Sequence, residues 1–176
     1  MVLVDESGFM LQPLVRRTWA EKGRTPVIDQ WDRRDRVSVI AALALSVKRQ
    51  RLRLFFRLLD HNAKAEDFVW FLNDLRKELQ RKLVVVWDNL GAHRRTEHTL
   101  TVLGCRWARF ARLPPYAPEL NPVEHVWTTA KWGRLANAPP DNVGQLKSNV
   151  TTELHSQSLE QQLLRSHFRW ARLDLN

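Results

Sequence analysis

The sequence predicts a single α/β domain built on a mixed β-sheet. Its 176 residues suit one domain, apolar strand-like segments fill the first half, and helices alternate with strands in the second. With 44% hydrophobic and 27% charged residues, the composition is that of a globular protein and excludes a disordered one. No repeat or Gly/Ser linker divides the chain. We therefore expect residues 1–176 to form one domain.

Strand-like segments dominate the first half of the chain. Four segments predict strands, the early ones joined as hairpins: 2–5, 16–23, 36–47 and 51–59. The second of these is a hairpin partner closed by Gly23. In the fourth, Arg51 and Arg53 face one way and the intervening leucines the other, because successive strand residues point to opposite faces.

Helices and strands alternate in the second half. The apolar run KLVVVWDN at 82–89 is typical of a buried parallel strand. The other predicted elements are helices at 65–81 and 94–104, a strand at 106–112, a loop with four prolines at 113–122, and helices near 122–136, 142–156 and 158–172. Ser158, with Gln161 three residues on, is expected to open the last helix.

The charge points toward a polyanionic partner. The sequence holds 28 Lys and Arg against 19 Asp and Glu, a net charge of +9. Most of the excess lies in the segment 14–57, whereas residues 141–176 are neutral. Such a field suits DNA or RNA, whose phosphates release counterions on binding. A basic surface without a partner remains the alternative.

Cysteine content and hydropathy limit where the protein works. A single cysteine excludes a disulfide framework. The longest apolar stretch, 37–47, is well short of the roughly 20 residues of a membrane span. The N-terminal residues, MVLVDESGF, lack the basic head of a secretory signal. We expect a soluble, cytoplasmic protein with no membrane partner.

Two aspartates follow apolar strands. Asp5 ends VLVD and Asp88 ends LVVVWD. If these strands are neighbours, the two carboxylates meet at the carboxyl edge of the sheet, where α/β proteins bind ligands. Their repulsion would favour a divalent cation between them. The alternative is that each aspartate merely ends its strand through turn chemistry.

Glu124 is the third candidate acid. The sequence Asn121-Pro122-Val123-Glu124 has the pattern of a helix start, with Asn as N-cap and Pro at the first helical position. Spacing alone favours a capping glutamate. A first-turn glutamate also projects toward the end of the sheet, so a place in the same acidic site stays open.

Histidine, cysteine and tryptophan give weaker signals. His93, His98 and Cys105 do not have the spacing or number of a zinc ligand set. Of the eight tryptophans, Trp127 and Trp132 follow Glu124 on the predicted helix. Stacking on bases is one interpretation of that pair, and packing between helix and sheet is the favoured one.

Three sequence blocks resemble the catalytic domain of DDE transposases of the mariner-like group, in particular its bacterial insertion-sequence branch. The blocks are VDESGF, VVVWDNLGAH and LPPYAPELNPVEHVW. The last is long and distinctive, and 35 residues separate Asp88 from Glu124, close to the interval of that group. The resemblance implies an RNase H-like fold with a mixed five-stranded sheet flanked by helices. It also implies that Asp5, Asp88 and Glu124 are catalytic and metal-binding.

The resemblance implies a metal-dependent reaction on DNA. A pair of Mg²⁺ ions, for which Mn²⁺ can substitute, would support phosphodiester hydrolysis at the ends of a mobile element and strand transfer into target DNA. Lys131 lies two helical turns after Glu124 on the same face and is a candidate contact to the DNA backbone. The other candidates surround the fourth strand: Lys48, Arg49, Arg51 and Arg53.

Members of the group normally carry helix-turn-helix modules before the first catalytic strand, and the few residues before Asp5 leave no room for them. We therefore expect the module that recognises element ends to be absent from this polypeptide, which is then the second product of a split element, the product of a truncated gene or an isolated domain. A separate helix-turn-helix subunit and a second copy of the chain are candidate partners, and we expect association with the bacterial nucleoid. Two other functions are compatible with the sequence. One is a nuclease of the RNase H or resolvase type, and the other is a non-catalytic DNA-binding remnant of a transposase.

Overall fold

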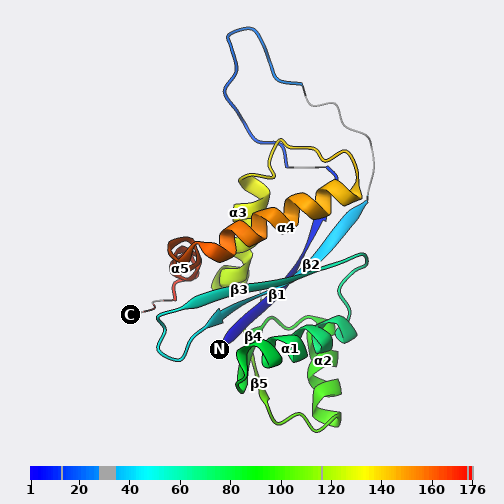
Figure 1. Cartoon of the computed structure of the whole chain (residues 1–176), viewed down its shortest axis with the longest axis vertical. Coiled ribbons are helices and arrows are strands. Elements are labelled where there is room, and N and C mark those ends of the chain that lie inside the picture. Colours follow the sequence, from blue (N-terminus) through cyan, green and yellow to red (C-terminus); the bar gives the residue numbers. More distant parts are fainter. Residues whose placement is uncertain (13, 28–34, 116, 174, 176) are drawn as a thin grey trace.

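A five-stranded mixed sheet with helices on both faces forms the protein (Figure 1). The computed structural model describes residues 1–12, 14–27, 35–115, 117–173 and 175. The strands, in chain order, are β1 (Val2–Met10), β2 (Arg36–Leu45), β3 (Leu52–Leu59), β4 (Leu83–Trp87) and β5 (Ala108–Arg112). In space their order is β3-β2-β1-β4-β5, with antiparallel pairing from β1 to β3 and parallel pairing from β1 through β4 to β5. The predicted α/β class and mixed sheet are confirmed.

Helices cover the two faces of the sheet unequally. One face carries α1 (Ala65–Leu79) and α2 (Gly91–Val102). The other carries α3 (Pro122–Trp132), α4 (Val143–Leu159) and α5 (Gln161–Trp170), which pack on β1, β2 and β3. Alternation along β2 fills both cores, since Val39 and Ala41 join the second helix group while Ile40 and Ala42 join the first. Among the described helices, none is long and apolar enough to cross a membrane.

Strand β1 is longer than the sequence predicts. It continues to Met10 because β2 pairs with it along its whole length. The parallel partner β4 pairs only with Val2 and Leu3 of β1. The prediction that Asp5 ends its strand is therefore wrong. Asp5 lies in the middle of β1, just beyond the point where the parallel pairing with β4 stops.

Two other strand predictions need correction. Residues 16–23 form no strand: their side chains are exposed, no strand pairs with them, and the turn at Gly23 is all that remains of the predicted hairpin. Strand β4 is parallel as predicted, but it is not buried on both faces, since Val84 is 43% exposed. The reason is that α3, α4 and α5 pack over β1 to β3.

Helix boundaries differ from prediction mainly near the C-terminus. Helix α2 begins at Gly91, before the predicted start, and α3 ends at Trp132 instead of 136. Ser158 does not open the last helix, because α4 continues through it to Leu159 and Glu160 is the N-cap of α5. The side chain of Gln161 instead accepts the Leu52 N–H (3.1 Å) and donates to the Leu52 carbonyl (2.8 Å) on edge strand β3.

Candidate active site

A cavity of about 450 Å³ opens at the end of the sheet where β4 stops, and all three predicted acids line it. Asp5 comes from β1, Asp88 directly follows β4, and Glu124 lies in the first turn of α3. Because Leu3 pairs with Val86, Asp5 and Asp88 stand at the same level of two neighbouring strands. The proline-rich loop, including Pro114, Pro115 and Pro118, forms another wall.

Asp5 is the most buried of the three acids, at 8% exposure. The indole N–H of Trp127 donates a hydrogen bond of 2.8 Å to its Oδ2. Burial, followed by the nearby charges of Glu124 and Glu6, raises the pKa of Asp5 to about 8. A pKa of about 8 favours the protonated carboxyl group at neutral pH, and a positive charge in the cavity would favour its ionisation.

The Asp88 carboxylate is oriented by two donors. Its Oδ1 accepts the Leu90 N–H at 2.9 Å and lies 2.6 Å from Nδ1 of His93. On the other side of the imidazole, Nε2 lies 3.3 Å from the Glu6 carboxylate, without a well-aligned hydrogen bond. His93 thus connects β1 to the residue that follows β4.

The imidazole of His93 is held rigidly in the core. It is 1% exposed, stacks on Trp87 at 4.5 Å between ring centroids, and meets Phe68 edge-on. Burial alone would lower the pKa of His93, but the carboxylates of Glu6 and Asp88 outweigh it and raise that pKa. A positively charged imidazole between two carboxylates therefore fits this position.

Glu124 enters the site from a well-capped helix. The Asn121 side chain accepts the Val123 N–H at 3.2 Å, which confirms Asn121 as the N-cap of α3. The Asn121 N–H already donates to the Pro118 carbonyl at 2.8 Å, so Glu124 has no reciprocal capping role to fill. Burial raises the pKa of Glu124, Lys131 opposes that rise, and the carboxylates of Glu6 and Asp88 add to it.

Lys131 is the one predicted DNA-contact residue beside the acids. Its Nζ donates to Ser7 Oγ at 2.7 Å and lies 5.1 Å from the centre of the Phe9 ring. Burial lowers the pKa of Lys131, while Glu124 and Asp5 oppose that change. The other four candidates lie at the opposite end of the sheet, on or beside the β2–β3 turn: Lys48, Arg49, Arg51 and Arg53.

Carboxylate oxygens are the ligands that Mg²⁺ prefers, and the crowding of acids around Asp5 leaves negative charge to be neutralised. The donor set of the cavity therefore suits a divalent cation. As arranged in the described residues, however, no three His, Cys, Asp or Glu side chains already form a compact metal-binding cluster. The three carboxylates share a cavity, and metal binding would require them to draw closer.

Sequence reasoning missed the parts played by Glu6 and His93. Glu6 follows Asp5 within the block VDESGF, and His93 closes the block VVVWDNLGAH. Their place in these distinctive blocks could have marked both residues as candidates. Their contact with each other could not be predicted, because it depends on the pairing of β1 with β4. Trp127 packs in the core against Phe9, as favoured, and also hydrogen-bonds Asp5.

Comparisons with known proteins agree with this geometry. Residues 1–147 match the family model of the DDE superfamily endonucleases. The fold is similar to that of the Mos1 mariner paired-end complex with Mn, at 16% identity and a TM-score of 0.64, covering 97% of this chain and 51% of that one. It is also similar to the catalytic domain of Mos1 mariner transposase, at 15% identity and a TM-score of 0.58, covering 97% and 74%.

A more distant similarity reaches a retroviral assembly, the simian T-cell lymphotropic virus intasome in complex with PP2A regulatory subunit B56 gamma. It has 11% identity and a TM-score of 0.55, and covers 88% of this chain and 46% of that one. No curated protein matches the sequence. This chain spans about half the length of the Mos1 chains in the paired-end complexes. The family match over most of the chain, together with the RNase H-like fold, places this protein in the DDE superfamily of endonucleases.

Proposed function

We propose that this chain is the catalytic domain of a transposase, which cleaves DNA phosphodiester bonds at the ends of a mobile element and joins them to target DNA. The observation that carries the proposal is the shared cavity of Asp5, Asp88 and Glu124 at the carboxyl end of the sheet. The similar Mos1 structures are described as transposase complexes with a transposon end and as a strand-transfer complex. DNA is therefore the proposed partner.

The three carboxylates are the proposed ligands of a pair of divalent cations. One Mos1 complex is described with Mn and another with Mg, which supports these two ions as candidates. Bound ions would activate the attacking water and neutralise charge on the cleaved phosphate and leaving oxygen. The protein contributes the orientation of the ligands: Trp127 holds one oxygen of Asp5, and His93 with the Leu90 N–H holds one oxygen of Asp88.

Joining needs no second set of catalytic residues in this proposal. The 3′ hydroxyl freed by cleavage would attack target DNA within the same cavity, so hydrolysis and strand transfer use the same three acids. Lys131 is placed to meet a backbone phosphate, because it is the cation beside Glu124 and Asp5. The proline-rich loop would confine the substrate on the opposite wall.

The test is a cleavage and joining assay on duplex DNA with Mn²⁺ or Mg²⁺. We expect the chain to nick duplex DNA with little sequence preference and to join a pre-cut DNA end to a plasmid. Glu124→Gln should abolish both activities, and Glu119→Gln, an exposed glutamate on the neighbouring 3-10 turn, should retain them. Cleavage of an RNA–DNA hybrid without any joining would contradict the proposal and favour an RNase H-type nuclease.

A further inference from the structure

Six basic side chains gather at the end of the sheet opposite the carboxylates. They come from three segments, namely the β2–β3 turn, the junction of α1 with β4, and the approach to β5: Lys48, Arg49, Arg51, Arg81, Lys82 and Arg106. All six are exposed, and within the described part of the chain none has a carboxylate partner. The segments 46–51, 80–83 and 103–107 contain no acidic residue, so the positive charge is not offset locally.

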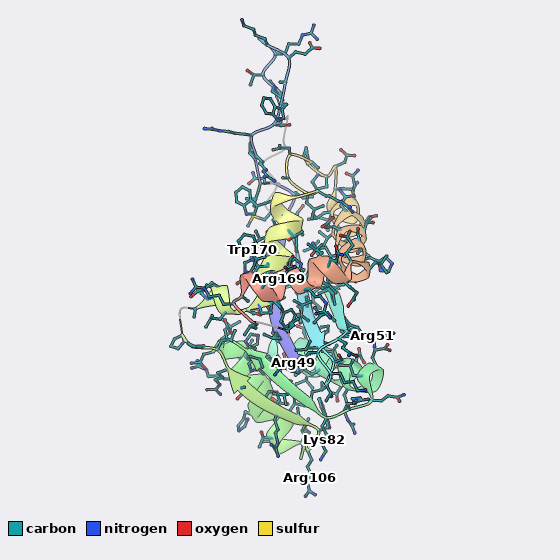
Figure 2. All side chains as sticks on the ribbon, turned by 90° about the vertical axis from the view of Figure 1, so that its left-hand side faces the viewer. Arg49, Arg51, Lys82, Arg106, Arg169 and Trp170 are labelled. Atoms are coloured by element: carbon teal, nitrogen blue, oxygen red, sulfur yellow. The ribbon has the colours of Figure 1, made fainter. Side chains whose placement is uncertain are left out.

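Backbone hydrogen bonds join the second and third segments and tie the end of β2 to the N-terminus, while a shared hollow is lined by the first and second segments. The Leu45 N–H donates to the Met1 carbonyl at 2.9 Å, and the Leu83 N–H donates to the Trp107 carbonyl at 2.7 Å. Figure 2 shows Arg51 and Arg49 on the same side of the sheet, with Lys82 and Arg106 farther toward the lower end of the molecule. A hollow of about 530 Å³ lies between the first two segments.

The backbone of the β2–β3 turn has an unusual conformation at Arg49. Arg49 has a φ of 55°, in the left-handed region that favours glycine. Its N–H donates to the Ser46 carbonyl at 2.9 Å, and Ser46 Oγ accepts the Arg51 N–H at 3.1 Å, which closes the turn. The turn therefore carries a cation at a position where glycine would be less strained.

The basic end of the sheet lies far from the proposed cleavage site. Lys82 and Asp88 flank β4, and six residues of strand at about 3.3 Å each place them about 20 Å apart. That length corresponds to about six nucleotides along one strand of a duplex, at 3.4 Å each. A phosphate held at the basic end is therefore not the phosphate cleaved at the carboxylates.

The chemistry favours the backbone of duplex DNA over stacked bases. The aromatic residue in these segments is Trp107, and the guanidinium of Arg76 covers its ring at 5.4 Å. Cations without an open aromatic platform offer bases no stacking surface, so contacts to backbone phosphates are favoured, and such contacts carry no sequence information. Arg53 is also engaged, since it pairs with Glu78 at 2.6 Å.

We propose that the six residues form a second DNA-binding surface, which holds duplex DNA at least about six base pairs away from the cleaved phosphate. The ligand class rests on the proposed function. Through this surface the domain would grip flanking or target DNA while the carboxylates act on another segment.

The test measures binding without catalysis. The full chain is titrated with a 30-base-pair duplex in EDTA, between 50 and 200 mM salt, using fluorescence anisotropy. The edge variant replaces Arg49, Arg51, Lys82 and Arg106 by Gln. The control variant replaces four exposed cations outside this surface by Gln and so has the same net charge: Arg17, Lys22, Lys64 and Arg94. Melting curves verify that both variants fold.

We expect the edge variant to have a salt slope smaller by about 3.6, at 0.9 for each of four lost phosphate contacts. Between 50 and 200 mM salt both proteins lose affinity for DNA. The factor by which the wild type loses affinity should be about 150 times larger than the factor for the edge variant. The control should keep most of the wild-type slope. Equal salt slopes in the two variants would overturn the proposal. A change of oligomeric state confined to the edge variant would also overturn it, because it would assign the surface to a second copy of the chain. Because the assay requires no cleavage, a failure of this proposal can be distinguished from a failure of the transposase proposal.

Discussion

Replacing Asp5 by Asn tests how strongly the surroundings of this carboxylate oppose its negative charge in the metal-free protein. Asn keeps the size of the side chain and an oxygen that can accept the Trp127 N–H. It removes the titration of a group whose pKa is raised to about 8 from an ordinary value of 3.8. The comparison therefore isolates the proton that the folded protein holds at this position.

The sign and size of the effect follow from linkage. A carboxyl group with a higher pKa in the folded state binds its proton more tightly when folded, so stability falls as pH rises between the two pKa values. With values of 3.8 unfolded and about 8 folded, the metal-free wild type should lose about 4 kcal/mol of unfolding free energy between pH 5 and pH 8 through this group. The Asn variant should lack that contribution.

Urea denaturation in EDTA at several pH values measures the difference. The wild type and Asp5→Asn should diverge as pH rises, with the variant more stable at pH 8. Asp141→Asn, the same change at an exposed aspartate, should follow the wild type. Parallel pH profiles for wild type and Asp5→Asn would refute the raised pKa and the charge crowding from which a cation site is inferred.

Three further substitutions test the surroundings of the site. Asp88→Asn should change the free energy of unfolding little, because the relief of repulsion with Glu124 is offset by the loss of the charge that pairs with His93, while Mn²⁺-supported nicking falls by orders of magnitude; full nicking activity would remove Asp88 from the ligand set. His93→Ala should raise the Mn²⁺ concentration for half-maximal nicking, and His93→Asn, which keeps a donor toward Asp88, should recover part of the loss; an equal Mn²⁺ requirement in all three proteins would contradict a positioning role. Trp127→Phe deletes the N–H donated to Asp5 and should cost about 1 kcal/mol in urea denaturation at pH 6; an unchanged free energy would show that this bond contributes nothing.

The alternation of strands and helices was readable from the sequence because local pattern decides it. Strand β4 and the Asn121 N-cap of α3 both rest on short-range signals, and both are confirmed. The full length of β1 was not readable, because Glu6–Met10 form a strand only through their pairing with β2. The segment 16–23 has strand-like residues but no neighbouring strand to complete its hydrogen bonds.

The candidate site divides in the same way. The three acids were identified from distinctive sequence blocks, and the structure lines one cavity with them. The contact of His93 with Glu6 arises only when two distant strands pair, so no spacing in the sequence announces it. The raised pKa of Asp5 likewise depends on burial and on neighbours contributed by α3.

The side-chain amide of Gln161 covers the start of the exposed edge of β3. An edge strand presents unpaired N–H and carbonyl groups that can template pairing with another chain. On β3, Gln161 occupies both such groups of Leu52, as a neighbouring strand would. Gln161 belongs to α5, which lies beyond the residues 1–147 that match the endonuclease family. A chain cut after the family-matched region would keep the three acids but lose α5 and most of α4, so it would expose the Leu52 backbone groups together with the apolar face beneath these helices, and would be prone to aggregate.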